Sequence, residues 1–280
     1  MSRNKLTYVF NDGNTIPAIG FGSYKADGNI GMEAVKSALK LGYRLIDTAE
    51  MYGNEAEIGR AIHSSGISRE DIFITTKLWR DHLGAEHVRP HFIKSLKKLG
   101  LEYLDLYLIH WPCNNKTSAD WREINSETWL EFEKLQQEGF VRSIGVSNFL
   151  PHHLEPLLQN CSVKPAVNQI EFHPGYWQQD TYEKCRQEDI LIQAWSPLAR
   201  GKIFNNEVLI SIAGCHHKSV SQVALRWIMQ KGCVPIPKSN NQIRMKENLE
   251  VFDFELSPSE MLTIDQMQAI GFSGYHPDRI

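Results

Sequence analysis

Short apolar runs alternate with longer amphipathic stretches along almost the whole chain. Eight of the runs are apolar enough to be buried strands, as expected when helices cover a parallel sheet. They span residues 19–22, 43–47, 73–77, 104–110, 142–146, 166–170, 191–195 and 234–237. The last run contains two prolines, which remove backbone donors, so it fits a strand least well.

Helical periodicity fills the gaps between these strands. Apolar residues recur at helical spacing within 88–99 and within 220–227, for example. A further helix is expected near the C-terminus, because Ser257 and Glu260 have the spacing of a capping box and Pro258 occupies the first helical position.

A strand followed by a helix, eight times in 280 residues, predicts an α/β fold of the (β/α)8 TIM-barrel type. We expect residues 1–280 to form a single barrel domain. Residues 6–10 and 15–19 flank a turn that contains Asp12-Gly13, which predicts an N-terminal β-hairpin. The helix that begins at Ser257 is then an extra C-terminal one.

A doubly wound sheet is the alternative architecture. Such a sheet usually carries a G-x-G-x-x-G fingerprint directly after its first strand. Here Gly20-Phe21-Gly22 is followed by Ser23-Tyr24-Lys25, so the third glycine is missing. The barrel is therefore the better prediction.

Composition and charge exclude several partners. Lys and Arg total 30 against 33 Asp and Glu, which leaves no basic field for nucleic acid or for a membrane surface. No apolar stretch reaches the roughly 20 residues of a membrane span, and residues 1–10 are too polar for a signal peptide. The five cysteines are scattered without C-x-x-C spacing, which is typical of reduced thiols. We expect a cytoplasmic protein.

Polar, aromatic and cationic side chains gather where the predicted strands end. In barrels, catalytic groups come from the C-terminal ends of the strands and from the loops that follow. Since such side chains are costly to bury without partners, their concentration at one rim predicts a shared site. They are Asp47, Lys77, His110, Ser147 with Asn148, Gln169, Trp195 with Ser196, and Lys238 with Ser239.

Four residues form a mechanism for carbonyl reduction. Tyr52 follows Asp47 by five positions, and a free tyrosine has a pKa of about 10, which is high for a proton donor. We expect the ammonium of Lys77 to lower that pKa and Asp47 to keep Lys77 charged. His110 orients the substrate oxygen, and Tyr52 protonates it.

The hydride must come from a nicotinamide cofactor, because no protein side chain delivers one. Lys238, Ser239, Arg244 and Asn248 lie at the predicted start of a helix, where two cations, a hydroxyl and helix N–H groups match a 2′-phosphate. This predicts NADPH.

Three residues are expected to hold the nicotinamide end of the cofactor. Asn148 and Gln169 have the amide groups that would bind its carboxamide. Trp195 has an aromatic face that would stack on the nicotinamide ring.

At these residues the sequence resembles the aldo-keto reductases, over nearly its whole length. The resemblance lies in several long motifs that follow one another in a single order. They are Gly20-Phe21-Gly22-Ser23-Tyr24, Asp47-Thr48-Ala49 through Tyr52-Gly53-Asn54-Glu55, Thr76-Lys77-Leu78-Trp79, Asp105 through Pro112, Ile144 through Phe149, Asn168-Gln169, and Ile236-Pro237-Lys238-Ser239 with Arg244, Glu247 and Asn248.

The resemblance implies a (β/α)8 barrel that binds NADPH/NADP+ without a Rossmann fold. It implies a catalytic tetrad of Asp47, Tyr52, Lys77 and His110. It also implies a cofactor site at Ser147, Asn148, Gln169, Trp195, Lys238, Ser239, Arg244 and Asn248, to which we add Ser196 and Leu198 on the loop after Trp195. The family is often monomeric, so we expect a monomer.

Two departures from the family pattern bear on the substrate. Trp195 stands where many members have tyrosine. The loops after His110, after Leu198 and at the C-terminus are short, which predicts an open site walled by Tyr24, Trp79 and Trp111. Small or varied aldehydes and ketones are then the expected substrates, as in the bacterial branch of glyoxal and 2,5-diketo-gluconate reductases.

Other functions compete with reduction. Lys77 in a barrel would also suit a Schiff-base aldolase, and the whole fold would suit an NADPH-binding sensor. Short-chain dehydrogenases use Tyr and Lys four residues apart on one helix, which does not match Tyr52 and Lys77.

No metal site is expected from the spacing of the histidines and cysteines. Cys215-His216-His217 lacks further ligands at a suitable distance along the chain. We interpret His152 and His153 as surface residues at a helix start.

Overall fold

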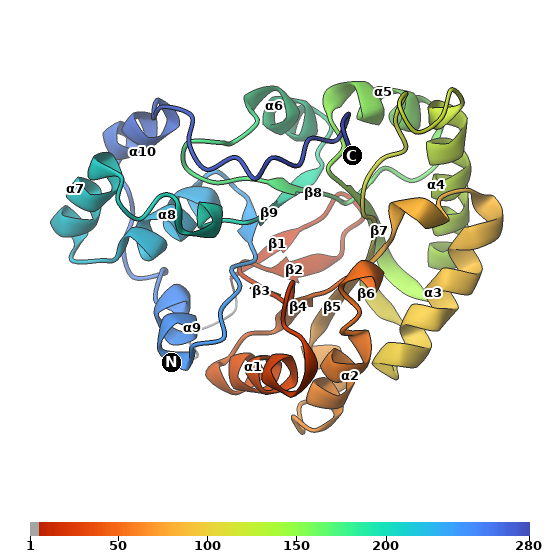
Figure 1. The fold of residues 1–280 in the computed structure, drawn as a ribbon, viewed down its shortest axis with the longest axis horizontal. Helices are drawn as coiled ribbons and strands as arrows, with labels where there is room; N and C mark the ends of the chain where they lie inside the picture. Colours follow the sequence, from red (N-terminus) through yellow and green to blue (C-terminus); the bar gives the residue numbers. More distant parts are fainter. Residues whose placement is uncertain (1–5) are drawn as a thin grey trace.

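The barrel is confirmed by the strand order of the structure, a computed structural model that describes residues 6–280. Residues 1–5, which belong to the predicted domain and to the polar N-terminal stretch, lie outside the described part. Eight parallel strands follow one another around the sheet in chain order (Figure 1). They are β3 (Phe21–Gly22), β4 (Leu45–Asp47), β5 (Phe73–Leu78), β6 (Leu104–Ile109), β7 (Val141–Ser147), β8 (Val167–Glu171), β9 (Leu191–Trp195) and β10 (Val234–Pro235).

Two backbone hydrogen bonds close the sheet between its first and last strands. Gly20 N donates to Pro235 O at 2.9 Å, and Gly22 N donates to Pro237 O at 3.1 Å. A Cβ on Gly22 would lie 2.8 Å from Ile236 O, so the seam needs glycine there. The prolines leave β10 only two residues long, because proline has no N–H to donate.

Helices cover the outside of the barrel, one or more after each strand (Figure 1). Apolar residues of both layers form one continuous core between strands and helices. The helices are α1 (Gly28–Leu41), α2 (Glu55–His63), α3 (Ala85–Leu99), α4 (Trp121–Gln137), α5 (Pro151–Asn160), α6 (Gln179–Gln187), α7 (Glu207–His216), α8 (Val220–Gln230), α9 (Gln242–Leu249) and α10 (Pro258–Asp265). The extra C-terminal helix is α10, and its predicted capping box is present.

The predicted N-terminal hairpin is also present, and it plugs one end of the barrel. Its strands β1 (Thr7–Val9) and β2 (Thr15–Pro17) pair antiparallel. Phe10 and Ile16 pack against the inward-facing side chains of the strands. Asn11 and Asn14 donate to backbone oxygens just before or at the start of β8 and β7. The hairpin therefore covers the N-terminal ends of the strands, and the opposite end is left for a site.

The chain after α10 returns across that opposite end to reach α5 (Figure 1). Ile270 N donates to Gly175 O, and Ser273 N and Oγ donate to Glu171 at the end of β8. Along residues 6–280, no helix combines the length and the apolar character needed to traverse a bilayer.

Candidate active site

A cavity of about 500 Å3 opens at the C-terminal ends of the strands. It brings together most of the side chains that the sequence predicted for one site. Those that line it are Tyr24, Asp47, Tyr52, Trp79, His110, Trp111, Ser147, Asn148, Gln169, Trp195, Ser196, Leu198 and Lys238. Lys77, Ser239, Arg244 and Asn248 do not line it, for different reasons given below.

A buried ion pair lies beneath the cavity floor. Lys77 Nζ lies 2.7 Å from Asp47 Oδ1 and also donates to Thr48 O at 2.7 Å, and its side chain is fully buried. Burial raises the pKa of Asp47 and lowers that of Lys77, while each partner's charge opposes the shift. The two side chains lie at the ends of the neighbouring strands β4 and β5, so strand pairing sets their separation.

Tyr52 lies on the short turn η1 (Glu50–Tyr52) that follows β4. Its ring centroid is 5.1 Å from Lys77 Nζ and 5.7 Å from the His110 ring. We predicted that Lys77 lowers the pKa of Tyr52. Instead, burial raises that pKa well above its usual value, and the charge of Asp47 adds to the rise. The prediction fails because burial, the largest cause of the shift, outweighs the attraction of the Lys77 ammonium for the phenolate.

His110 also lines the cavity, next to Tyr52. Burial, and then the charge of Lys77, hold its pKa well below the usual value, so its imidazole is neutral at neutral pH. Its Nδ1 is buried without a hydrogen-bond partner among the described residues. The Trp79 ring lies 5.3 Å away in an edge-to-face arrangement.

Amide side chains connect Asp47 and His110 to residues on β8 and β9, on the other side of the cavity. Gln169 Nε2 donates to Asp47 Oδ2 at 2.7 Å and to Gln193 Oε1 at 2.6 Å. Asn148 Nδ2 donates to His110 O, and Asn148 Oδ1 accepts from Trp195 Nε1 at 2.8 Å. The donors of both predicted carboxamide ligands are thus already used within the protein, and Gln169 also holds Asp47 in place.

Three cations gather near the other end of the cavity: Lys25 and Lys238 line it, and Arg244 is close enough for its charge to act on Lys238. Burial lowers the pKa of Lys238, and the charges of Arg244 and Lys25 lower it further, against the opposing effect of Asp27. In the part of the chain that the structure describes, none of Lys25, Lys238 and Arg244 forms a salt bridge. An unpaired group of cations of this kind attracts an anion.

The other groups predicted to bind the phosphate are the helix N–H groups, Ser239 and Asn248, and all of them have partners within the protein. Asn241 Oδ1 accepts from the N–H groups of Ile243 and Arg244, so these helix N–H groups are not free to bind a ligand, as we expected them to be. Ser239 Oγ bonds with the backbone of Asn241. Asn248 is buried. Burial raises the pKa of Tyr43, and a side-chain hydrogen bond with Asn248 opposes that rise.

Comparison with known proteins identifies this architecture. The sequence model of the Aldo/keto reductase family matches residues 18–269. The chain belongs to this family. Members are oxidoreductases that act on carbonyl groups, and the match spans the cavity-lining residues from Tyr24 to Lys238.

Several relatives of this aldo-keto reductase match along their whole length. Glyoxal reductase of Bacillus subtilis is 46% identical over 277 residues, which covers 99% of this chain and 98% of that protein. An aldo/keto reductase of Brucella melitensis has a TM-score of 0.88 at 47% identity, over 92% of this chain and 98% of that one. A Bombyx mori aldo-keto reductase in complex with NADP has a TM-score of 0.88 at 35% identity, over 98% and 99% of the two chains.

The C-terminal tail of this aldo-keto reductase supplies a wall that sequence reasoning missed. Tyr275 and Ile280 line the cavity, and the Tyr275 ring lies 6.5 Å from that of Trp111. Asn114 Nδ2 donates to Pro277 O at 2.7 Å and to Ile280 O at 3.2 Å. The open site that we predicted is therefore partly walled by residues from a segment without periodicity.

Further lining residues had no signal in the strand-end pattern. Lys25 and Met51 follow β3 and β4 by several positions, and Arg200 lies after β9 on a turn with φ of 54°. They belong to loops, where hydrophobic periodicity predicts nothing. A search for cations within a few residues of each predicted strand end would have found Lys25 and Arg200.

Proposed function

We propose that this protein is an NADPH-dependent reductase that converts small aldehydes and ketones to alcohols, with Tyr52 as proton donor. The observation that carries the proposal is the placement of two groups on one cavity. Tyr52, His110 and the buried Lys77–Asp47 pair lie at one end, and the unpaired cations lie at the other. Similarity to a glyoxal reductase and to an NADP-bound reductase supports it.

The residues present fit NADPH. Lys238, Arg244 and Lys25 would hold the 2′-phosphate, since phosphate oxygens form strong charge-assisted hydrogen bonds with cations. Between the cations and Tyr52, the cavity is lined by residues that would hold the rest of the cofactor. They are Ser147, Asn148, Gln169, Trp195, Ser196 and Leu198. When bound, NADPH supplies a hydride to the carbonyl carbon.

The side chains of the protein handle the carbonyl oxygen. His110, neutral at neutral pH, donates a hydrogen bond to that oxygen and directs it toward Tyr52. Because the pKa of Tyr52 is raised, its hydroxyl stays protonated until the oxygen becomes a strong base, and then the proton transfers. The phenolate that remains is stabilised by Lys77 and regains a proton from water.

The Schiff-base alternative has less support. Its nucleophile would have to reach a substrate, but Lys77 does not line the cavity. Its Nζ is fully buried and bonds to both Asp47 and Thr48. The sensor alternative predicts NADPH binding without turnover, so it is decided by the following experiment.

Replacing Tyr52 by Phe removes the proton donor and keeps the ring. We expect Tyr52→Phe to bind NADPH as tightly as wild type and to lose about 10²- to 10⁴-fold in kcat. Consumption of NADPH with methylglyoxal, phenylglyoxal and nitrobenzaldehyde measures the rate, and fluorescence titration measures binding. Wild-type rates in the variant would contradict the proton-donor role. Tight binding with no turnover by wild type would favour the sensor.

Replacing the cations tests the cofactor. Lys238→Ala and Arg244→Ala should each weaken NADPH binding by about 10- to 100-fold and NADH binding much less, since only NADPH has the 2′-phosphate. Lys246→Ala is the matched control, because Lys246 lies on the same helix but pairs with Glu250. Equal losses for NADPH and NADH in a fluorescence titration would show that the 2′-phosphate lies elsewhere.

We also propose the finer features of the enzyme. Tyr24, Trp79 and Trp111, which line the cavity, contact the substrate. Residues 1–280 act as one domain and as a monomer in the cytoplasm, which fits cysteines that are all free thiols. Light scattering of the purified protein should give the mass of one chain, 32.1 kDa.

A further inference from the structure

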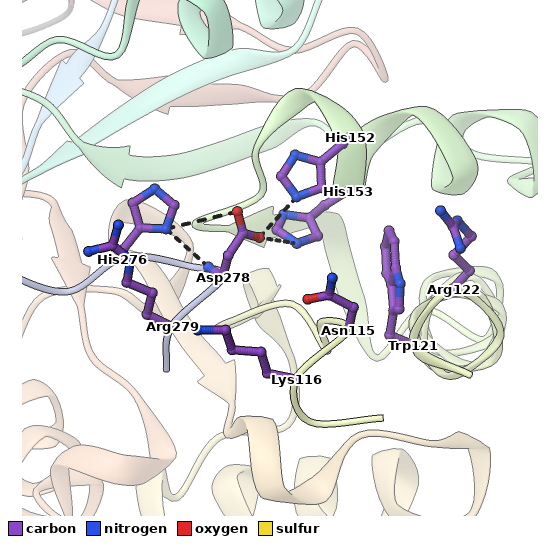
Figure 2. Close-up of a pocket in the computed structure, with 9 residues that line it drawn as sticks. All are labelled: Asn115, Lys116, Trp121, Arg122, His152, His153, His276, Asp278 and Arg279. Carbon is purple, nitrogen blue, oxygen red and sulfur yellow. Dashed lines mark hydrogen bonds and ion pairs between the residues drawn. The ribbon is translucent and has the colours of Figure 1, made fainter. Parts of the chain in front are cut away.

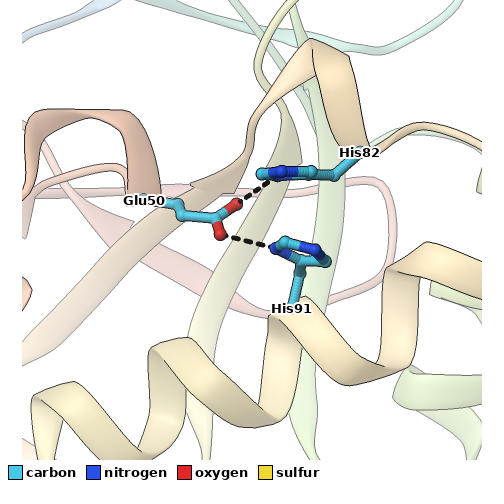
Figure 3. Close-up of side chains that lie close together, drawn as sticks. All are labelled: Glu50, His82 and His91. Atoms are coloured by element: carbon cyan, nitrogen blue, oxygen red, sulfur yellow. Dashed lines mark hydrogen bonds and ion pairs between the residues drawn. The ribbon is translucent and has the colours of Figure 1, made fainter.

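Two histidines and a glutamate form a compact cluster behind the turn that carries Tyr52. Figure 3 shows the carboxylate of Glu50 facing the stacked rings of His82 and His91 from one side. Glu50 Oε2 lies 3.1 Å from His82 Nδ1, and Oε1 lies 2.6 Å from His91 Nδ1. The two rings are stacked, with centroids 3.5 Å apart and planes inclined by 21°. Three separate segments, η1, η3 (Arg80–His82) and α3, thus converge on one point.

The donor atoms of this cluster suit a transition metal ion. The three ligand atoms all lie within 4.8 Å of one another. The side chain of Glu50 is 8% exposed, and those of His82 and His91 are 33% and 20% exposed, so an ion can reach the site from solvent. Imidazole nitrogen and carboxylate oxygen are ligands of Zn²⁺, at about 2.0–2.2 Å.

The protons of the two rings are compatible with a bound metal. Both Nδ1 atoms face Glu50, and within residues 6–280 neither Nε2 makes a hydrogen bond. Each ring can therefore carry its proton on Nε2 and offer the lone pair of Nδ1 to an ion. The ligand atoms, now 2.6 and 3.1 Å apart, would have to separate to about 3.3 Å around a tetrahedral ion. The stacked rings would also have to turn, so that the lone pairs in the two ring planes converge on the ion.

A second histidine cluster lacks this freedom. Figure 2 shows His152, His153 and Asp278 beside a cavity of about 420 Å3. His153 Nδ1 accepts the N–H of Leu150 at 3.2 Å, so its proton lies on Nε2, which points at Asp278. That nitrogen carries the ring proton and has no lone pair for a metal. His153 is also buried, which corrects our interpretation of it as a surface residue, whereas His152 is exposed.

We propose that Glu50, His82 and His91 form a binding site for one Zn²⁺ ion or a similar divalent transition metal, with water in the remaining position. The site lies outside the catalytic cavity but touches two of its walls. Glu50 lies two residues before Tyr52, and its Oε2 is 3.5 Å from Trp79 N. A bound ion would fix the Tyr52 turn to the loop that carries Trp79, and so stabilise the fold around the cavity.

Metal titration of untagged protein tests the site directly. Every protein in this test, including the one called wild type below, carries Cys215→Ser, because Cys215 is an exposed thiol that would compete for metal. Calorimetry with Zn²⁺ should give one site per chain, and Co²⁺ should give visible absorption bands of a coordinated ion. We expect His91→Gln and His82→Asn to lose that one equivalent, with at least 30-fold weaker binding. Both replacements still donate a hydrogen bond to Glu50, which protects the turn.

The second cluster provides the matched control. His152→Asn with Asp278→Asn should keep the full equivalent of Zn²⁺. The midpoint of thermal unfolding should rise with equimolar Zn²⁺ in wild type and in this control but not in His91→Gln, because a ligand that binds only the folded state stabilises it. Absence of a bound equivalent in wild type, or its loss only in the His152/Asp278 variant, would overturn the proposal.

Discussion

Burial sets the protonation of the side chains around the cavity. Tyr52 and His110 are both neutral at neutral pH, because a charged form without water is costly. Lys77 and Asp47 stay charged only as a pair, and removing either partner would leave an isolated buried charge. The positions of Asp47, Lys77 and His110 could be predicted from strand ends, and that of Tyr52 from the loop after Asp47. The direction of the Tyr52 pKa shift could not, since it depends on surrounding atoms that are distant in sequence.

The two histidine clusters outside the cavity could not be predicted from the sequence either. Glu50 and His91 are 41 positions apart, and His152 and Asp278 are 126 apart. No spacing along the chain marks such pairs, because they come from separate loops and helices that the barrel happens to align. Only the fold brings them together.

His153 should make the protein less stable in acid. Burial lowers its pKa from 6.5 to about 4, the charges of His152 and His276 lower it too, and Asp278 acts in the opposite direction. The unfolded chain therefore binds this proton more readily than the folded one. Stability from neutral His153 is present above about pH 6.5 and is lost as the pH falls toward 4.

Urea unfolding of His153→Asn across this range measures the effect. Between pH 7 and pH 4 the free energy of unfolding should fall less in the variant than in wild type, by up to about 3 kcal/mol. Curves that stay parallel over this range would mean that the folded and unfolded states bind this proton equally, so that burial does not lower the pKa of His153.

At the scale of elements, strand pairing determines how close two backbones come. Periodicity predicted each strand and most helices, because apolar spacing reports which face is buried. It did not separate α7 from α8, nor reveal that β3 and β10 keep only two residues each. Those short strands meet at the seam, where proline and glycine backbones set the length of the pairing.

Replacing a strand glycine and a helix glycine by alanine should change the stability of the protein in opposite directions. A Cβ on Gly145 in β7 would lie 2.7 Å from Val167 O and 2.7 Å from Leu108 Cδ2, so Gly145→Ala should cost about 1–3 kcal/mol of stability. Gly214 in α7 has nothing within 4 Å of an added Cβ. Gly214→Ala should therefore stabilise the protein by about 0.5–1 kcal/mol. Chemical denaturation of both variants measures the difference, and a shift of the same sign in both would refute this account.

At the scale of the whole molecule, the hairpin closes one end of the barrel and the tail borders the cavity at the other end. Phe10 and Ile16 fill the end where the strands begin. The tail crosses the other end and is held by contacts such as Ser273 with Glu171, 102 residues apart. The order of strands and helices along the chain predicts the barrel. It does not predict where an irregular tail of this kind will rest, because the contacts that hold the tail across the barrel are long-range.

Tyr275 is the residue through which the C-terminal tail should affect substrate specificity. It lies on the cavity wall, with its ring 6.5 Å from Trp111 and with the Arg200 guanidinium 5.2 Å from the ring centroid. An aromatic substrate between Trp111 and Tyr275 would gain contact with both rings, whereas methylglyoxal is too small to do so. Because one aromatic contact contributes about 0.5–1.5 kcal/mol, Tyr275→Ala should raise KM for phenylglyoxal by about 2- to 12-fold.

Steady-state kinetics with both substrates tests this role of the tail. KM for methylglyoxal and the affinity for NADPH should stay near wild type, since neither depends on the outer wall. Phe204→Ala is the control, because Phe204 is a similarly exposed ring that does not line the cavity. An equal rise in KM for both substrates would mean that Tyr275 supports the structure of the whole rim. An unchanged KM for phenylglyoxal would place aromatic substrates on the opposite side, against Tyr24 and Trp79.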